Sequence, residues 1–451
     1  MNPDWSAVEA ETISQLQALI RFDTTNPPGN ELPLARHIAR QFDGAGIENQ
    51  LLVASAARAA LIGRLRGTGA KRPIILLAHM DVVGVEADKW SCDPFGGIVR
   101  DDYLYGRGAI DDKGMLAANL MTMLLLQRGL DSGSPKLERD VVFVATSDEE
   151  AGGEWGIKWI GEHHSELLDA EFAINEGGRT RIIGGGRRYL AIQTAEKISH
   201  MVTLTARGPA GHAAVPLPDN AIMHLARALA RLSYYLEPVV LTETTRRFFS
   251  ELSRIWPDEK ESVAMRTLGS GDSTDIDDAA AVLSSTPVFN AVMRNGFSAT
   301  LASSGVQGNV IPAEATAALN VRTLPGQSIE DAVSRLSTVA DEPSVEFTIS
   351  AKGEEAPPSD QSSAMFHAIA QSAQELDPQL AIVPYLSTGV TDSAYLRRRG
   401  VNCYGILPFP MERGDEERMH GHDERVPLKS LHFGTRLIYE SVRRVACSAI
   451  H

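Results

Sequence analysis

Hydrophobic and polar positions along the first 195 residues alternate between two periods. Apolar residues recur at helical spacing from about Val8 to Phe22, from about Glu31 to Phe42, from about Lys113 to Arg128 and after Trp155. Between these segments, short apolar runs indicate buried strands at Ala59–Leu65, Pro73–Ala78, Val141–Thr146 and Glu171–Asn175. The alternation predicts an α/β fold in which helices cover both faces of a largely parallel sheet.

The pattern changes near Ser199. Strand-like and helix-like runs then follow in the order β-α-β-β-α-β, at His200–Ala206, Asn220–Leu232, Ser298–Ser303, Ala315–Arg322, from Gly326 through Val339, and at Ser344–Ala351. This order predicts a smaller α+β domain over residues 196–351. A polar, helix-prone insertion interrupts it between about residues 236 and 295.

A linker-like sequence, Gly353-Glu354-Glu355-Ala356-Pro357-Pro358-Ser359, precedes a last segment in which helix and strand patterns alternate again. We therefore predict that residues 1–195 and 352–451 form one discontinuous catalytic domain. Residues 196–351 form the domain inserted into it. The candidate site residue His420 lies beyond the linker, whereas the other acidic and histidine clusters precede the inserted domain, and this supports the division.

Five clusters of acidic or imidazole side chains fall at turns, several of them where strand-like runs end. The clusters are His79-Met80-Asp81, Asp111-Asp112-Lys113-Gly114, Asp148-Glu149-Glu150, Glu176-Gly177-Gly178 and His420-Gly421-His422-Asp423-Glu424. Carboxylates beside a core are costly unless they are compensated, and two divalent metal ions would compensate them. Sites in parallel sheets gather at the carboxyl ends of strands. The clusters therefore predict a dinuclear zinc hydrolase.

The first two clusters suggest separate roles for neighbouring residues. The two-residue period of a strand puts His79 and Asp81 on one side, so Asp81 is suited to orient a metal-bound His79. A strand-end histidine beside a solvated aspartate is an equally simple interpretation. Asp112 stands where it can cap the following helix, which leaves Asp111 free to bridge two ions.

The remaining clusters also have ordinary interpretations when each is taken alone. Three consecutive acids at a turn are commonly solvated, Glu176 could belong to a plain turn, and His420 or His422 could be a loop histidine. Beside zinc, Glu150 could coordinate while Glu149 accepts a proton from an acidified water. The order of all five clusters, rather than any one of them, carries the prediction.

The composition excludes several classes of binding partner. Asp+Glu 58 against Lys+Arg 43 gives a formal charge of -15, which argues against nonspecific binding to nucleic acid or anionic membranes. No apolar run approaches the roughly 20 residues of a membrane span, and the amino terminus lacks a secretory pattern. Three scattered cysteines do not form a disulfide framework or a cysteine zinc site. We therefore predict a cytoplasmic protein.

Taken together, the motifs resemble the M20 metallopeptidase family, which includes aminoacylase, acetylornithine deacetylase, succinyl-diaminopimelate desuccinylase and glutamate carboxypeptidase. The likeness runs from about Thr24 to Val426, with all five metal-site motifs in family order. The resemblance implies that Asp111 bridges two zinc ions and that the Asp111-Asp112 peptide is cis. It assigns His79 and Glu176 to one ion and Glu150 and His420 to the other. Asp81 then matches the residue that orients a ligand, and Glu149 matches the general base.

The resemblance also assigns residues that hold substrate. Three of them lie in the middle domain, which in relatives is a lid and dimerisation domain. His212 resembles a histidine that stabilises the oxyanion from the partner subunit, and Asn309 and Arg322 resemble residues that hold substrate, Arg322 through its free carboxylate. Gly389 and Thr391 belong to a loop like the family's Gly-x-Thr-Asp loop. Alternatively, His212 is a plain loop histidine, Asn309 caps a turn and Arg322 pairs with a surface acid.

The resemblance implies hydrolysis of an N-acyl amino acid or small peptide by a homodimer. An aminopeptidase of related fold and a metal-binding protein without catalysis are the alternatives. Asn320 and Gly296 depart from residues common in relatives, so the accepted side chain and acyl group stay open. A mixed nitrogen and oxygen ligand set also suits cobalt or manganese in place of zinc.

Overall fold

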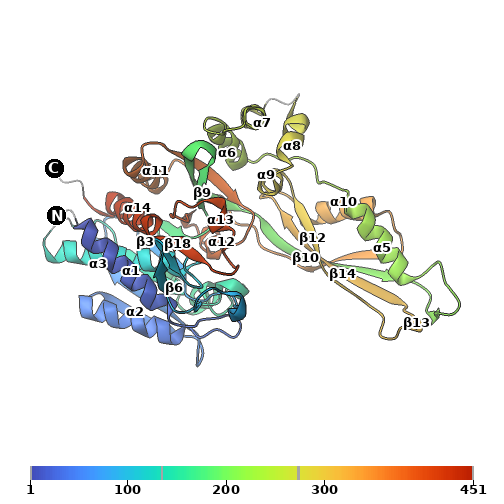
Figure 1. The fold of residues 1–451 in the computed structure, drawn as a ribbon, viewed down its shortest axis with the longest axis horizontal. Helices are drawn as coiled ribbons and strands as arrows, with labels where there is room; N and C mark the ends of the chain where they lie inside the picture. Colours follow the sequence, from blue (N-terminus) through green and yellow to red (C-terminus); the bar gives the residue numbers. More distant parts are fainter. Residues whose placement is uncertain (1–2, 134–135, 272–274, 449–451) are drawn as a thin grey trace.

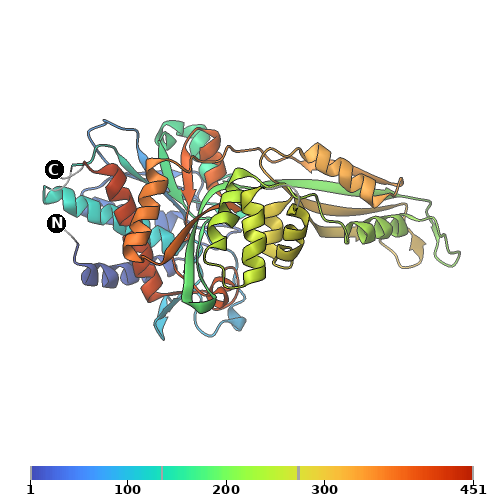
Figure 2. The ribbon, with the colours of Figure 1, turned by 90° about the horizontal axis from the view of Figure 1, so that it is seen from above.

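The computed structural model describes residues 3–133, 136–271 and 275–448. The molecule is elongated, with the two chain termini at one end (Figure 1). A large sheet with its helices occupies that end, and a smaller sheet extends away from it (Figure 2). The chain crosses between the two sheets at Lys197 and again in residues 352–363.

The large sheet has nine strands, and its order is β1-β2-β6-β3-β7-β17-β9-β16, with β8 paired to β9. Their bounds are β1 (Glu48–Val53), β2 (Ala59–Leu65), β3 (Ile74–His79), β6 (Val141–Thr146), β7 (Phe172–Asn175), β8 (Arg179–Ile183), β9 (Arg187–Glu196), β16 (Leu380–Ser387) and β17 (Asn402–Gly405). The four central strands β6, β3, β7 and β17 are parallel. Strands β1, β2 and β8 pair antiparallel, so the sheet is mixed rather than largely parallel. The connections β1–β2 and β8–β9 are too short for the crossover that a parallel pair needs.

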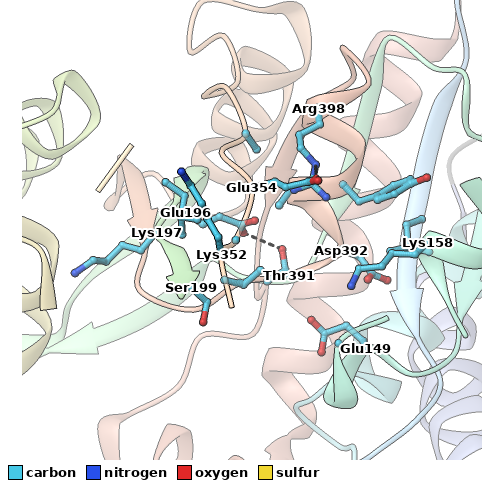
Figure 3. A pocket seen from close by; sticks show the side chains of 18 of the residues that line it. Glu149, Lys158, Glu196, Lys197, Ser199, Lys352, Glu354, Thr391, Asp392 and Arg398 are labelled. Atoms are coloured by element: carbon cyan, nitrogen blue, oxygen red, sulfur yellow. Dashed lines mark hydrogen bonds and ion pairs between the residues drawn. The ribbon is translucent and has the colours of Figure 1, made fainter. Parts of the chain in front are cut away.

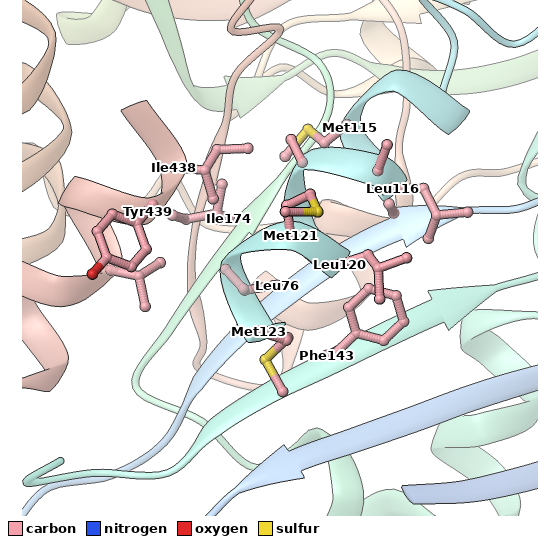
Figure 4. Packing of buried hydrophobic residues seen from close by; sticks show 14 of the residues in the cluster. Leu76, Met115, Leu116, Leu120, Met121, Met123, Phe143, Ile174, Ile438 and Tyr439 are labelled. Carbon is pink, nitrogen blue, oxygen red and sulfur yellow. The ribbon is translucent and has the colours of Figure 1, made fainter. Parts of the chain in front are cut away.

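Helices cover both faces of this sheet, as predicted. Because strand side chains alternate, Leu76 belongs to a core with the helices α1 and α3, while Leu77 belongs to a core with α4 and α12. Figure 4 shows α3 packed through Met115, Leu120 and its neighbours on Leu76 and Phe143. The helices are α1 (Trp5–Ile20), α2 (Leu32–Ala45), α3 (Lys113–Asp131), α11 (Ala364–Leu376) and α14 (Leu428–Ala446) around the first core, and α4 (Ile157–His163) and α12 (Asp392–Arg398) around the second.

The small sheet has the strand order β12-β14-β10-β15, and all of its pairs are antiparallel. Its elements are β10 (Ile198–Arg207), α5 (Ala221–Leu232), β12 (Gly296–Ser304), β14 (Glu314–Thr323), α10 (Ile329–Ala340) and β15 (Val345–Ala351). These follow the predicted β-α-β-β-α-β order. Alternate residues of β10 and β14 are buried against α5 and α10.

The predicted helical insertion consists of α6 (Glu243–Ser253), α7 (Glu259–Ser270), α8 (Ile276–Leu283) and α9 (Pro287–Met293). Its core residues Phe248, Phe249 and Leu252 pack with Tyr189 of β9 and Tyr385 of β16. The insertion therefore shares its apolar core with an edge of the large sheet rather than with the small one.

Short elements complete the fold: β4 (Ile98–Arg100), β5 (Tyr103–Tyr105) and β18 (Arg425–Pro427) form a three-stranded sheet, β11 (Gly211–His212) pairs with β13 (Val310–Ile311), and α13 is Arg413–Glu416. Within the described ranges, no helix has the length and apolar character that crossing a bilayer requires. All three cysteines are free thiols.

Candidate metal centre and active site

Four predicted ligands converge at one edge of the large sheet. His79 Nε2 lies 2.9 Å from Asp111 Oδ1, and His420 Nε2 lies 3.0 Å from Asp111 Oδ2. His420 Nε2 is also 3.2 Å from Glu150 Oε1. One ligand atom from each of His79, Asp111 and Glu150 lies within 4.8 Å of the others. Asp111 thus sits between two imidazoles, as a bridging carboxylate would.

The parallel strands bring these residues together. His79 ends β3, Glu149 and Glu150 follow β6, and Glu176 follows β7. The carboxyl ends of parallel strands lie along the same edge, so three distant segments meet there. Asp111 joins them from the turn before α3, and the Asp111-Asp112 peptide is cis, as the resemblance implied.

The carboxylates of the cluster lie close together and need nearby positive charge to stay ionised. Desolvation, together with the charge of the neighbouring Asp111 carboxylate, raises the pKa of Glu176 to about 8. Desolvation also raises the pKa of Glu149, and the charges of Glu176 and Asp392 act in the same direction. Burial opposes ionisation of Asp111, but hydrogen bonds from His420 and His79 outweigh it and lower its pKa well below the usual range. Too many carboxylates crowd this cleft for the two imidazoles alone to balance.

The donor set fits divalent metal. Two imidazole nitrogens and several carboxylate oxygens are the ligands that zinc takes in catalytic sites. Glu150 Oε1 is buried and accepts no hydrogen bond from any described residue, although the His420 ring is close. Such an oxygen is costly to bury unless a cation completes its environment.

Asp81 holds the ligand segments together rather than binding at the centre. The His79 ring contacts the Asp81 backbone oxygen through Nδ1 at 3.0 Å, while the Asp81 carboxylate is 3.5 Å from the same nitrogen. That carboxylate accepts the backbone N–H groups of Glu149 and Glu150, each at 3.2 Å. Asp81 therefore orients both the imidazole and the acidic turn.

A second support, formed by Asn26, Arg58 and Asp148, was not predicted from the sequence. The Asn26 amide donates to Asp81 Oδ2 at 2.8 Å and to Asp148 Oδ1 at 3.1 Å. Arg58 pairs with Asp148 at 2.9 Å. Asp148 has φ 67, in the left-handed region, which turns the chain sharply between β6 and Glu149. Only the acid-rich turn was visible in the sequence, because Asn26 and Arg58 lie in unrelated segments.

A third support, Arg107 with Glu424, was also missed. Arg107 Nη1 donates to Glu424 Oε2 at 2.6 Å, and both side chains are almost fully buried. Glu424 Oε1 accepts from the backbone N–H of Ile110 at 2.8 Å and of Asp111 at 3.1 Å. Arg107 also donates to the backbone oxygen of Gly421, beside His420. This pair ties the turn that carries Asp111 to the loop that carries His420.

The structure also bears on two finer predictions, Asp112 as a helix cap and the choice of His420 over His422. Asp112 occupies the position before α3, but its side chain does not cap the helix. Its Oδ2 instead accepts the backbone N–H of His79 at 3.3 Å. His422 lies away from the cluster, 2.9 Å from Glu86, which leaves His420 as the histidine at the centre.

A cavity of about 700 Å³ opens beside Glu149 (Figure 3). Glu196, Arg322, Thr391 and Asp392 also line it, so it reaches from the acidic cluster to the crossing between the two sheets. Arg322 Nε donates to Asn320 Oδ1 at 2.8 Å, and its buried Nη1 has no hydrogen-bond partner among the described residues. Gly389 lies in the same loop as Thr391 but is not part of the cavity wall.

His212 and Asn309 are not brought to this cluster. His212 belongs to β11 and Asn309 directly precedes β13, and this strand pair lies at the far end of the small sheet (Figure 1). There the backbone N–H of Ala213 donates to the backbone oxygen of Asn309 at 3.0 Å. Both residues are exposed. Within one chain, neither residue is near the predicted ligands.

Comparison with known proteins shows which family the chain belongs to. The model of peptidase family M20/M25/M40 matches residues 75–444. The chain belongs to this family. It is therefore a metallohydrolase that acts on amide or peptide bonds, as predicted.

Relatives extend over most of the chain. It is 30% identical over 368 residues to the probable carboxypeptidase S-like 2 of Dictyostelium discoideum, covering 80% of this chain and 69% of that protein. It is 26% identical over 381 residues to the human N-fatty-acyl-amino acid synthase/hydrolase PM20D1, covering 82% and 74%.

Solved structures share the fold at low identity. The M20 family metallo-carboxypeptidase Sso-CP2 of Sulfolobus solfataricus superimposes with a TM-score of 0.68 at 17% identity, covering 96% of this chain and 98% of that one. The Bacillus subtilis YXEP protein, a dinuclear metal binding peptidase of the family, gives a TM-score of 0.60 at 15% identity, covering 98% and 99%.

Proposed function

We propose that this protein is a dinuclear zinc hydrolase that cleaves the amide bond of an N-acyl amino acid or small peptide bearing a free carboxylate. The observation that carries the proposal is the convergence of His79, Asp111, Glu150 and His420 on one point beside a large cavity. The names of the relatives, a carboxypeptidase and an N-fatty-acyl-amino acid hydrolase, support substrates of this class.

In this proposal, His79 and Glu176 would hold one zinc ion, Glu150 and His420 would hold the other, and Asp111 would be shared by both. Cobalt or manganese would suit the same ligands. When bound, the two ions supply Lewis acidity, which polarises the scissile carbonyl and acidifies a water.

Glu149 then acts as the general base. Its carboxylate accepts a proton from the attacking water and delivers it to the nitrogen of the leaving amine. Two features support this assignment: Glu149 lines the cavity, and Asp81 holds the backbone N–H groups of Glu149 and its neighbour. A base fixed in this way needs little rearrangement when substrate arrives.

Arg322 is proposed to bind the substrate carboxylate. Its side chain reaches the cavity, and its closest hydrogen-bond partner, Asn320, is neutral. No described carboxylate forms an ion pair with the guanidinium, although the charge of Glu196 opposes the lowering of its pKa by burial. Its Nη1, which has no hydrogen-bond partner among the described residues, is a suitable donor to an anionic ligand. Gly389 and Thr391 contribute the loop beside it, and Asn309 completes the substrate site from the second subunit.

A homodimer would supply the residues that one chain leaves outside its own site. The exposed position of His212 supports its action in the partner's site, where it would stabilise negative charge developing on the carbonyl oxygen. Strand β12 is an exposed edge of the small sheet and carries the exposed Leu301, and such edges pair readily with a second chain. We also propose a cytoplasmic enzyme that binds neither membrane nor nucleic acid, in keeping with its charge of -15.

A hydrolysis screen tests the proposal. Purified protein is loaded with zinc or cobalt and offered dipeptides, N-acetyl and N-succinyl amino acids, and N-acyl amino acids with longer chains. We expect release of a free amino acid from at least one class, and loss of that activity when a chelator removes the metal. Matched amides without a free carboxylate should react poorly. Equal turnover of both sets would contradict the role of Arg322.

A further inference from the structure

Glu196 places a buried carboxylate where the chain leaves the large sheet. It is the last residue of β9 and lies opposite Ser387, the last residue of β16. Its side chain is 4% exposed, and it lines the cavity beside Thr391. Burying a carboxylate is costly unless charge and hydrogen bonds compensate it, so the contacts of Glu196 show what it holds.

The two carboxylate oxygens of Glu196 are held in different ways: Oε1 by an ion pair without a hydrogen bond, and Oε2 by two hydrogen bonds. Arg397 Nη2 of α12 lies 3.0 Å from Oε1, and that arginine side chain is 1% exposed. Gln193 Nε2 donates to Oε2 at 2.7 Å, and Thr391 Oγ1 donates to the same oxygen at 3.2 Å (Figure 3 shows the second contact). Burial raises the pKa of Glu196, while the Arg397 charge and the hydrogen bonds oppose that rise.

The hydroxyl of Thr391 forms two hydrogen bonds, one as a donor and one as an acceptor. It donates its hydrogen to Glu196 and accepts the backbone N–H of Ser393 at 3.2 Å, which caps the start of α12. Its only hydrogen is therefore committed within the protein. Thr391 shapes the cavity wall through its position, and substrate must find its donors elsewhere.

The other end of this loop is anchored nearby. The Ser387 backbone oxygen accepts the N–H of Lys197 at 2.9 Å, and Ser387 Oγ accepts the N–H of Gly389 at 3.2 Å. Residues 388–391 therefore run between an anchor at Ser387 and a second anchor at Glu196. Val390 and Thr391, which line the cavity, lie next to the second anchor.

We propose that Glu196 is a positioning residue for substrate binding. Together with Arg397 it holds Thr391, and through Thr391 it keeps residues 388–391 in the shape that receives substrate. This inference rests on the proposed function, because it requires that substrate occupies the cavity. It differs from a simple stabilising ion pair, since the effect of Glu196 must pass through Thr391.

Four variants test this path: Glu196→Gln, Thr391→Val, the double variant, and Thr391→Ser, which keeps the hydroxyl. We expect KM to rise about tenfold in the first two while kcat changes by less than about threefold, because uniform binding is lost. The double variant should bind no worse than either single variant, since both break one path. Thr391→Ser should raise KM less than Thr391→Val does, because the serine hydroxyl can still donate to Glu196.

Glu237→Gln is the matched control. Glu237 is also buried and pairs with an arginine, Arg335, at 2.6 Å, but its side-chain hydrogen bonds and ion pair go to Asn295 and Arg335 rather than to residues 388–391. We expect it to lower thermal stability without changing KM. If Glu196→Gln does not fold, Thr391→Val and Thr391→Ser still decide the question.

Hydrogen exchange provides a readout that does not need turnover. In Thr391→Val, amide exchange should speed up in residues 388–393 while β9 and β16 keep wild-type protection. Unchanged KM in Thr391→Val, additive effects in the double variant, or faster exchange spread over the whole sheet would each overturn the inference. A wild-type protein that hydrolyses no amide would instead refute the proposed function, and local exchange would still report whether Glu196 fixes the loop.

Discussion

At the scale of single residues, the candidate site separates side chains that face the cavity from side chains that support them. Glu149 and Glu150 are neighbours in sequence, yet Glu150 lies beside His420 and Glu149 lines the cavity. Two adjacent carboxylates can take different roles here because Asp81 fixes both of their backbone N–H groups. Replacing either one should therefore produce a distinct defect.

Glu149→Gln should leave zinc content near the wild-type value and lower kcat at least about a thousandfold, because an amide cannot accept the proton. Glu150→Gln, as the matched variant, should lose part of the metal. Metal analysis and steady-state kinetics on the same preparations separate the two effects. Full activity in Glu149→Gln would remove its assignment as base.

At the scale of elements, uniformly apolar strands were the easiest to predict. The observed bounds of β2 and β6 are those expected from the sequence, because central strands are buried on both faces. Strands β1, β8 and β9 were missed, since β1 and β8 are partly exposed and lack a continuous apolar run. The antiparallel direction of several strand pairs was missed too. Strand direction depends on how the connections run between strands, and no local sequence pattern indicates that.

The same limit explains why the ligands were predictable and their supports were not. Asp111 and His420 stand in recognisable motifs, whereas Arg107 and Glu424 act through contacts between segments 317 residues apart. Asn26 and Arg58 likewise reach Asp148 from separate turns. A sequence can indicate residue types that suit metal, but which buried partner holds each ligand depends on the folded chain.

The Arg107–Glu424 pair gives a prediction at this scale. Glu424→Gln should weaken zinc binding about 10- to 100-fold, because it loosens the turn of Asp111 and the loop of His420 together. Competition with a chelator measures this affinity directly. Glu171→Gln is the control, since Glu171 pairs with buried Arg139 at 2.7 Å at the opposite end of β7. Equal zinc affinity in both variants would contradict the role of Glu424.

At the scale of the whole molecule, different parts of the fold carry different residues of the candidate site. The large sheet and its loops carry the predicted ligands. The small sheet carries Arg322 at its near end, and the separate β11–β13 pair at its far end carries His212. Arg322 reaches the cavity of its own chain, while His212 does not. If the proposed homodimer forms, a second chain would supply the His212 that one chain leaves outside its own site.

Mixed dimers test this arrangement. His212→Ala and Glu149→Gln should each be nearly inactive alone, because every site lacks one group. Mixing them should restore part of the activity: in a mixed dimer, the subunit with intact Glu149 receives His212 from its partner. At equal amounts, about half of the dimers are mixed and each has one complete site, so about a quarter of wild-type activity should return. Differently tagged subunits, purified together, establish that mixed dimers have formed. Mixed dimers without activity would show that His212 does not act across the interface.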